Sequence, residues 1–483
     1  MGNTDILNYI NGEFVEPVSG KYLDNIAPAT GKISGKIPAS GEADCDRAYA
    51  AARDAFPAWS AMPAQERSAI LLRLANLIEA NKEKLAIAES EDSGKPLWLT
   101  RSVDIMRASA NIKFFAESIL HVFSESHALP GEAINFTLRQ PIGVVACISP
   151  WNLPLYLFTW KIAPALATGN TVVAKPSEVT PLTAYLFSQL CVEAGLPPGV
   201  LNVLHGHGAE IGKAMVAHPG IKAISFTGGT STGREIARVA APMFKKLSLE
   251  LGGKNPNIIF SDCDFDQAVK QSVRAAFTNQ GQICLCGSRI FVERSIYDKF
   301  KTAFVQEVKN LKVGNPMDDA HFMGAMVSEA HLEKVLHYIE LAKEEGGKIL
   351  CGGNRLRLND EWAGGFYLEP TVIDGLAADC RTTTEEIFGP VVTITPFDSE
   401  EEALQFANGT EYGLAAMVWT SNLSRAHRVA EKLQSGIVWI NCWMLRDLRT
   451  PFGGVKQSGV GREGGWEALR FFTEAKNVCI KYS

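Results

Sequence analysis

The sequence predicts an α/β fold with two doubly wound parallel sheets. Between about residues 142 and 260, short apolar runs alternate with segments of helical periodicity, and a second such region extends from about 255 to 450. Strands that alternate with helices form parallel sheets covered by helices. The 483 residues also exceed what one hydrophobic core usually serves, so we expect more than one domain.

The first 140 residues change from short strands to helices. Residues 7–40 combine short apolar pieces with Gly and Pro turns, which is typical of small strands and hairpins. Apolar residues three and four positions apart then predict surface helices over 50–56, 67–87 and 105–122. Residues 134–139 alternate between apolar and polar side chains and predict a strand.

The strands expected in the two sheets are short and apolar. For the first sheet they are 143–148, 171–174, 201–204, 223–226 and 246–249. For the second sheet they are 257–260, 288–292, 391–394, 417–419 and 437–440. We expect one more exposed strand at 477–481.

Composition excludes several classes of function. A formal net charge of −6 argues against a nucleic-acid partner, and the nine histidines show no metal-ligand spacing. The most apolar stretch, 144–173, is interrupted by polar residues and prolines and does not predict a membrane span. Ten scattered cysteines without a signal-peptide pattern lead us to expect reduced thiols and a cytoplasmic location.

Cys284 and Glu250 supply the residue types needed for acyl chemistry at an aldehyde. A thiolate can attack a carbonyl carbon, and a carboxylate can activate the water that later releases the acyl group. Each residue also has an ordinary structural interpretation. A free cysteine is often a buried packing residue, and a glutamate is often a surface carboxylate.

Seven motifs in order along the chain resemble the NAD(P)-dependent aldehyde dehydrogenase superfamily. They are Pro150-Trp-Asn-Leu-Pro154, Lys175-Pro-Ser-Glu178, Phe226-Thr-Gly-Gly-Thr-Ser-Thr-Gly233, Glu250-Leu-Gly-Gly253, Gly281-Gln-Ile-Cys284, Glu386-Ile-Phe-Gly-Pro390 and Pro451-Phe-Gly-Gly454. The resemblance covers nearly the whole chain. It implies an NAD-binding domain over 1–121 and 142–251, a catalytic domain over 252–457, and oligomerisation strands in 122–141 and 466–483.

The same resemblance implies how the subunits assemble. In the family the C-terminal strand pairs across an oligomer interface with a strand like 134–139. We therefore expect a homodimer or homotetramer.

The resemblance also assigns the catalytic roles. Cys284 is the nucleophile, and the side-chain amide of Asn152 with the Cys284 backbone N–H binds the oxyanion of the thiohemiacetal. Glu250 is the base that activates water, and Lys161 relays its proton. The alternatives are a turn-capping role for Asn152 before Pro154 and a snorkelling side chain for Lys161.

The cofactor that the resemblance implies is NAD. Lys175 and Glu178 match the pair that holds the adenosine ribose, and a carboxylate there repels the 2′-phosphate of NADP. Glu386 holds the nicotinamide ribose with Phe388 nearby, and at Gly229, where relatives often have serine, we expect backbone contact only. The full expected set is Trp151, Lys175, Ser177, Glu178, Gly208, Gly212, Phe226, Gly228, Thr230, Gly233, Leu251, Glu386 and Phe388.

Two arginines point to an aldehyde that carries a carboxylate. Arg107 and Arg446 suit a neutral aldehyde poorly, because a desolvated guanidinium favours a bidentate carboxylate partner. Residues 149–161 and 443–449 resemble the branch of the family that oxidises 2-aminomuconic and 2-hydroxymuconic semialdehydes to their acids. The sequence does not separate these two substrates. The other expected pocket residues are Leu157, Trp160 and Phe452.

Several alternatives remain at the level of sequence. Arg446 could pair with Asp447 and Arg107 with Asp104 as ordinary ion pairs. The substrate could be betaine aldehyde, retinal or a broad range of aldehydes, although Arg446 would repel a cationic substrate. A non-catalytic relative or a CoA-acylating enzyme is disfavoured by the presence of Cys284 and Glu250.

Overall fold

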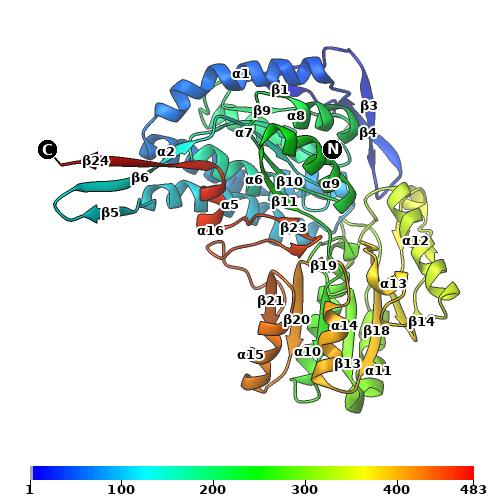
Figure 1. Cartoon of the computed structure of the whole chain (residues 1–483). Coiled ribbons are helices and arrows are strands. Elements are labelled where there is room, and N and C mark those ends of the chain that lie inside the picture. Colours follow the sequence, from blue (N-terminus) through cyan, green and yellow to red (C-terminus); the bar gives the residue numbers. More distant parts are fainter. Residues whose placement is uncertain (1–3, 483) are drawn as a thin grey trace.

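Two β-sheets with packed helices form the two lobes of the molecule, as Figure 1 shows for the computed structural model, which describes residues 4–482. A three-stranded sheet extends from the first lobe as an arm. This architecture confirms the predicted α/β fold with two large sheets. The outermost positions of the predicted domains, 1–3 and 483, lie outside the described residues.

The sheet of the first lobe has eight strands, and its five central strands are parallel. All five central strands were predicted, whereas β23, contributed by the C-terminal segment, was not. In spatial order the strands are β2 (Glu13–Val15), β1 (Asn8–Ile10), β9 (Leu201–Val203), β8 (Thr171–Lys175), β7 (Val144–Ile148), β10 (Ala223–Thr227), β11 (Lys246–Glu250) and β23 (Gly459–Val460).

The sheet of the second lobe has seven strands, of which only the edge strand β14 runs antiparallel to its neighbour. The five predicted strands are present, and β14 and β17 were not predicted. In spatial order the strands are β14 (Lys348–Cys351), β17 (Thr371–Asp374), β18 (Val391–Phe397), β13 (Arg289–Glu293), β12 (Pro256–Ile259), β20 (Ala415–Trp419) and β21 (Ile437–Ile440).

The N-terminal helices differ from the prediction at Asn81. The run expected as one helix over 67–87 is two helices, because the Asn81 side chain donates to the Leu77 carbonyl at 2.9 Å and the chain turns there. The elements of this region are α1 (Glu42–Ala61), α2 (Ala64–Ala80), α3 (Lys82–Ser93), α4 (Leu97–Leu99), η1 (Thr100–Asp104), α5 (Ile105–Ser118) and η2 (Ile119–His121).

The remaining helices connect the strands of the two sheets. In the first lobe they are α6 (Pro154–Ala167), α7 (Leu182–Glu193), η3 (Gly208–Gly212), α8 (Lys213–Ala217), α9 (Thr230–Ala240), η4 (Ala241–Met243) and α16 (Gly465–Phe471). In the second they are α10 (Phe265–Phe277), η5 (Thr278–Gly281), η6 (Arg294–Ile296), α11 (Tyr297–Lys309), α12 (Glu329–Glu344), η7 (Asp360–Trp362), α13 (Arg381–Thr384), α14 (Glu400–Asn408) and α15 (Leu423–Lys432).

Three further antiparallel strand pairs complete the fold. They are β3 (Tyr22–Ala27) with β4 (Lys32–Pro38), β15 (Arg355–Leu356) with β16 (Tyr367–Leu368), and β19 (Tyr412–Gly413) with β22 (Val455–Lys456).

The core of the first lobe contains the apolar stretch that the sequence analysis singled out. Every residue of β7, β8 and α6 is buried. A helix buried on all sides is apolar around its whole circumference, which explains the composition of this segment. Within residues 4–482 no helix is both long and apolar enough to cross a membrane.

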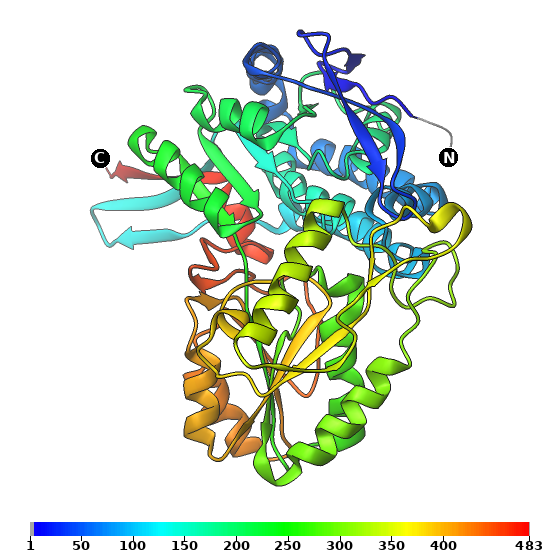
Figure 2. The same cartoon turned by 90° about the vertical axis from the view of Figure 1, so that its right-hand side faces the viewer.

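The arm corrects one expectation. Strand β24 (Thr473–Lys481) pairs with β6 (Ala133–Pro141) of the same chain, not with a neighbouring subunit, and β5 (Ser126–Leu129) lies on the far side of β6. Figure 2 shows the red β24 beside the cyan hairpin. Asn170 starts this pairing: its oxygen accepts from the Ile142 N–H at 2.7 Å, and its amide donates to the Phe472 carbonyl at 2.8 Å.

Candidate active site

A cavity of about 230 Å³ lies where the two lobes meet. Residues from five of the seven predicted motifs converge on it, although these motifs extend over more than two hundred positions of the chain. The wall is formed by Pro150, Trp151, Asn152, Thr227, Gly228, Gly229, Leu251, Gly252, Cys284, His331, Lys334, Glu386 and Phe388.

Cys284 follows an irregular turn at the end of α10. The turn needs left-handed backbone at Gly281, where φ is 69°, and a Cβ there would lie 2.2 Å from the Gly389 carbonyl oxygen. Glycine in the motif therefore lets the nucleophile loop pack against the Glu386–Pro390 segment. Burial, followed by the charges of Glu386 and Glu250, raises the pKa of the Cys284 thiol to about 12.

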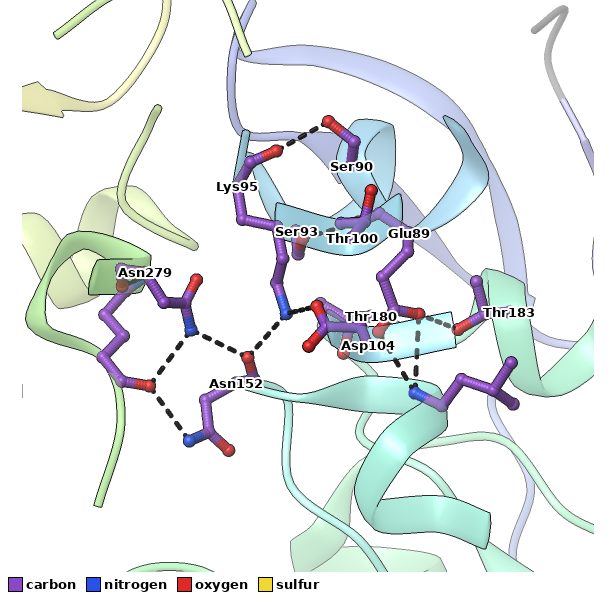
Figure 3. A network of polar contacts seen from close by, with 12 residues as sticks. Glu89, Ser90, Ser93, Lys95, Thr100, Asp104, Asn152, Thr180, Thr183 and Asn279 are labelled. Carbon is purple, nitrogen blue, oxygen red and sulfur yellow. Dashed lines mark hydrogen bonds and ion pairs between the residues drawn. The ribbon is translucent and has the colours of Figure 1, made fainter. Parts of the chain in front are cut away.

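Asn152, which lines the same cavity as Cys284, is held by hydrogen bonds to its side-chain amide and to its backbone carbonyl. Its amide donates to the Gln282 carbonyl at 3.0 Å, which leaves the second amide hydrogen for another acceptor. The backbone carbonyl of Asn152 accepts from Lys95 Nζ and from the Asn279 side-chain amide, each at 2.9 Å (Figure 3). The Asn152 side chain donates to a carbonyl 130 residues away and not to the turn before Pro154, which argues against the turn-capping alternative.

Glu250 ends β11 and is buried, so the surface-carboxylate alternative is wrong. Within residues 4–482 neither of its carboxylate oxygens has a hydrogen-bond partner. Burial, with Glu463 adding to it, raises its pKa well above the usual range despite the nearby Lys161. Gly453 of the Pro-Phe-Gly-Gly motif makes room for the carboxylate, because a Cβ there would lie 2.6 Å from Glu250 Oε1.

Lys161 is buried on α6, so the snorkelling alternative is wrong. Its Nζ lies 2.8 Å from Glu463 Oε1 and donates to Ser225 Oγ at 3.2 Å. Sequence reasoning missed Glu463. Glu463 could have been found from the sequence, because it is a carboxylate within a glycine-rich run, as Glu250 is.

A second, narrower cavity lies beside Cys284 and Glu250. Its volume of about 20 Å³ is enough for one water molecule. The lining residues are Leu153, Tyr156, Leu157, Thr227, Glu250, Leu251, Ile283, Cys284, Leu285, Leu414, Met444, Arg446, Phe452 and Glu463.

Arg446 and Arg107 meet at one tyrosine. Arg446 donates to the Tyr156 hydroxyl at 2.8 Å, and its guanidinium carbon lies 4.1 Å from the Phe452 ring centroid. The guanidinium carbon of Arg107 lies 5.6 Å from the centroid of the Tyr156 ring. Tyr156 was not predicted as a site residue, although it lies only four residues after Asn152.

Neither arginine has an ion-pair partner within the described part of the chain. Asp447 pairs with Arg449 at 2.5 Å, and Asp104 pairs with Lys95 at 2.7 Å. The two ion-pair alternatives are therefore wrong.

The apolar pocket residues divide into two groups. Leu157 and Phe452 line the narrow cavity as predicted. Trp160 is not part of that wall, and its ring lies 5.4 Å from the guanidinium carbon of Arg446.

Lys175 and Glu178 form an ion pair of 2.9 Å at the carboxyl end of β8. The Gly208 N–H donates to the other Glu178 oxygen at 3.2 Å. Burial raises the pKa of Glu178, but Lys175 and the backbone donors outweigh it and hold the pKa below the usual range. Gly212 packs beside Lys175, whereas the Ser177 hydroxyl accepts from the Val179 N–H at 3.2 Å.

The segment after β10 leaves open space at a helix start. A Cβ on Gly229 would meet no atom within 4 Å, and α9 begins at the next residue, Thr230. By contrast, a Cβ on Gly233 would lie 2.5 Å from Leu251, and one on Gly228 would lie 2.4 Å from Phe226. Open space before a helix N-terminus suits a pyrophosphate, which fits the expected dinucleotide.

Glu386 forms part of the wall of the larger cavity. It accepts from the Gly253 N–H at 2.8 Å, and Gly252 must lack a side chain, because a Cβ would lie 2.3 Å from Glu386 Oε2. Phe388 has a φ of 63°, and its carbonyl accepts from His331 at 2.7 Å. The ring centroids of Trp151 and Phe388 are 5.3 Å apart. His331 was not predicted.

The chain is similar to known proteins over nearly its whole length. The profile of the Aldehyde dehydrogenase family matches residues 14–478. The chain is 52% identical over 478 residues to a 2-aminomuconic semialdehyde dehydrogenase of Danio rerio, with 98% of each chain covered. It is 47% identical over 483 residues to a 2-hydroxymuconic semialdehyde dehydrogenase of Pseudomonas sp. (strain CF600), with 99% of each covered.

A solved structure shows the same fold. The structure of an indole-3-acetaldehyde dehydrogenase in complex with NAD⁺ superposes with a TM-score of 0.97 at 41% identity, covering 100% of this chain and 97% of that one. The convergent motifs, the matched profile and the full-length relatives together show that this chain belongs to the aldehyde dehydrogenase family.

Proposed function

We propose that this enzyme oxidises an acidic semialdehyde, 2-aminomuconic or 2-hydroxymuconic 6-semialdehyde, to the carboxylic acid with NAD as the acceptor. One observation carries the proposal: Arg446, without a carboxylate partner in residues 4–482, lines the cavity that also contains Cys284 and Glu250. The names of the relatives at 52% and 47% identity support the same two substrates.

Cys284 attacks the aldehyde carbon through its Sγ. The raised pKa keeps the resting thiol neutral, so the thiol first gives its proton to a water molecule, for which the narrow cavity beside it has room. The carbonyl oxygen becomes an oxyanion, which the free amide hydrogen of Asn152 and the backbone N–H of Cys284 stabilise. The Gln282 carbonyl accepts one hydrogen of the Asn152 amide and so orients the other hydrogen for binding the oxyanion.

Glu250 releases the product from the enzyme. After loss of hydride the acyl group remains on Cys284 as a thioester, and Glu250 removes a proton from the attacking water. Both of its oxygens are free for that proton, and the narrow cavity beside them has room for the water. The buried pair Lys161–Glu463 provides a route by which this proton leaves.

The larger cavity and the Lys175–Glu178 pair would hold NAD, which when bound accepts the hydride of the substrate. In this assignment Glu178 contacts the adenosine ribose, the backbone at Gly229 contacts the pyrophosphate and Glu386 contacts the second ribose. It divides the chain into an NAD-binding domain (1–121 and 142–251), a catalytic domain (252–457) and an arm (122–141 and 466–483).

Arg446, Arg107 and Tyr156 would together bind the substrate carboxylate. A guanidinium can donate two parallel hydrogen bonds to a carboxylate, and the Tyr156 hydroxyl, which accepts from Arg446, still has its own proton to donate. A cationic substrate such as betaine aldehyde would be repelled there, and retinal would leave Arg446 unpaired.

We also propose a homodimer or homotetramer in the cytoplasm. Strand β5 is exposed along its whole length and has an unpaired edge, and Phe123 beside it is 72% exposed, so a second subunit would cover this surface.

The absence of a disulfide among the ten cysteines supports a reducing compartment.

Glu178→Gln is expected to reduce the preference for NAD over NADP. The neutral amide no longer repels a 2′-phosphate, so the ratio of kcat/KM values should fall by roughly tenfold, which is about 1.4 kcal/mol. Steady-state NADH and NADPH formation measures the ratio. The matched control is Glu340→Gln, an exposed glutamate on α12, which should leave the ratio unchanged. A wild-type preference for NADP would contradict the role of Glu178.

Steady-state kinetics with a panel of aldehydes tests the proposed function. The panel pairs each acidic semialdehyde with a neutral aldehyde of similar length, and NADH absorbance gives the rate. We expect kcat/KM to be at least about tenfold higher for the acidic member, because a charged hydrogen bond that has lost its partner costs more than 1.4 kcal/mol. Equal values for acidic and neutral members would contradict the proposal.

A further inference from the structure

A buried ion pair that the proposed reaction does not use lies directly behind Asn152. Lys95, in the turn between α3 and α4, is 1% exposed, and Asp104 is fully buried. Lys95 Nζ lies 2.7 Å from Asp104 Oδ2 and donates to the backbone carbonyl of Asn152 at 2.9 Å (Figure 3). A buried ion pair gives little net stability, so its place beside the site requires another explanation.

The Asn152 carbonyl is a junction between the two lobes. Lys95 reaches it from the first lobe, and the Asn279 amide reaches it from the loop that carries Cys284. Asn279 has a φ of 54° and also donates to the Gln282 carbonyl at 3.2 Å, the same oxygen that accepts from the Asn152 side chain. The position of the Asn152 amide relative to Cys284 is therefore set by this network.

A residue of helix α3 also binds the backbone at the start of α6, three residues after Asn152. The buried Glu89 accepts from the Leu155 N–H at 3.3 Å, at the start of α6, and from the Thr183 hydroxyl at 2.6 Å. Lys95 and Glu89 thus fix the backbone on both sides of Leu153 and Pro154. The segment 152–155 is anchored at both ends by charged groups of one helix and the turn after it.

We propose that Lys95 is a positioning residue, which sets the Asn152 amide at the distance and angle that the oxyanion needs. The inference rests on the proposed role of Asn152 in the reaction. Lys95 itself touches neither substrate nor cofactor in this account. Because donors stabilise an oxyanion only in a narrow geometry, a small displacement of the Asn152 backbone should slow hydride transfer without weakening NAD binding.

A double-mutant cycle tests this proposal. The four enzymes are the wild type, Lys95→Met, Asn152→Ala and the double variant, and the measurement is the rate of the first NADH turnover. We expect Lys95→Met to slow that step by roughly ten- to a hundredfold in the wild-type background. In the Asn152→Ala background the same change should cost less than about threefold, because the amide that Lys95 positions is already absent.

Two further variants keep the cycle interpretable. Lys95→Met leaves Asp104 unpaired, so Lys95→Met/Asp104→Leu provides a version without a buried lone charge if the single variant does not fold. Lys245→Met is the matched control: its Nζ also donates to backbone carbonyls, those of Val216 at 2.6 Å and His218 at 2.7 Å, far from the site. The control should keep the wild-type rate.

The possible outcomes separate the inference from the function on which it rests. An equal cost of Lys95→Met in both backgrounds, or no cost in the wild type, overturns the positioning role and leaves the proposed reaction intact. An unchanged rate in Asn152→Ala overturns the oxyanion assignment itself, and the role of Lys95 with it. A loss of NAD affinity in Lys95→Met that accounts for the whole effect also overturns the proposal.

Discussion

The Cys284→Ala variant will form no NADH with any aldehyde. A methyl group cannot attack a carbonyl, and within the described residues no other thiol lines either cavity of the site. NAD affinity should stay within a few-fold of the wild type, because Cys284 forms only part of the cavity wall. The measurements are NADH absorbance over long incubations and equilibrium titration with NAD.

Cys286 provides the matched control for this experiment. It lies two residues from Cys284, but it is buried and its N–H donates to the Ile283 carbonyl at 3.0 Å. Cys286→Ala should therefore retain activity. Undiminished turnover in Cys284→Ala, together with its loss in Cys286→Ala, would move the nucleophile to Cys286.

The Glu250→Ala variant will transfer one hydride per site and then turn over only slowly. Without the carboxylate no base activates the water, so the acyl group stays on Cys284 as a thioester. Intact mass should show an adduct equal to the acyl group, and NADH should appear as a burst of one per site. A variant that cycles at the wild-type rate without an adduct would contradict the assignment.

The pH dependence of the wild type follows from the same residue. The pKa of Glu250 lies above its usual range, and only the deprotonated carboxylate acts as a base. Turnover limited by deacylation should therefore rise with pH as Glu250 loses its proton. This rise should be absent from the slow residual turnover of Glu250→Ala.

The sequence was sufficient to predict what local patterns and glycine motifs determine. All ten strands expected in the two large sheets are present; eight are largely buried, and β11 and β21 are partly buried. The glycines of the motifs have steric reasons that the structure makes explicit: Gly252 makes room for Glu386 and Gly453 for Glu250. Two strands of the second sheet were missed. β14 is a partly exposed edge strand with a weaker apolar signal, and β17 is buried but has only four residues, too few for a clear pattern.

What the sequence did not reveal are contacts between distant segments. Glu463 meets Lys161 across 302 positions, and Arg446 meets Tyr156 across 290. Each partner taken alone is an ordinary polar residue, so periodicity and spacing carry no signal of the pair. The pairing of β24 with β6 also joins distant segments, and Asn170 forms hydrogen bonds with the residue next to each strand, Ile142 and Phe472.

The central claim, a substrate carboxylate bound by arginines, is tested most directly by Arg446→Ala. The measured quantity is the loss of kcat/KM for an acidic semialdehyde compared with the loss for a neutral aldehyde such as hexanal. We expect a loss of about 2 to 4 kcal/mol for the acidic substrate, roughly thirty- to a thousandfold, and a far smaller loss for hexanal. Arg107→Ala should show the same contrast. Equal losses for both substrates in a variant with an unchanged melting temperature would contradict the account and leave an aldehyde dehydrogenase without a carboxylate site.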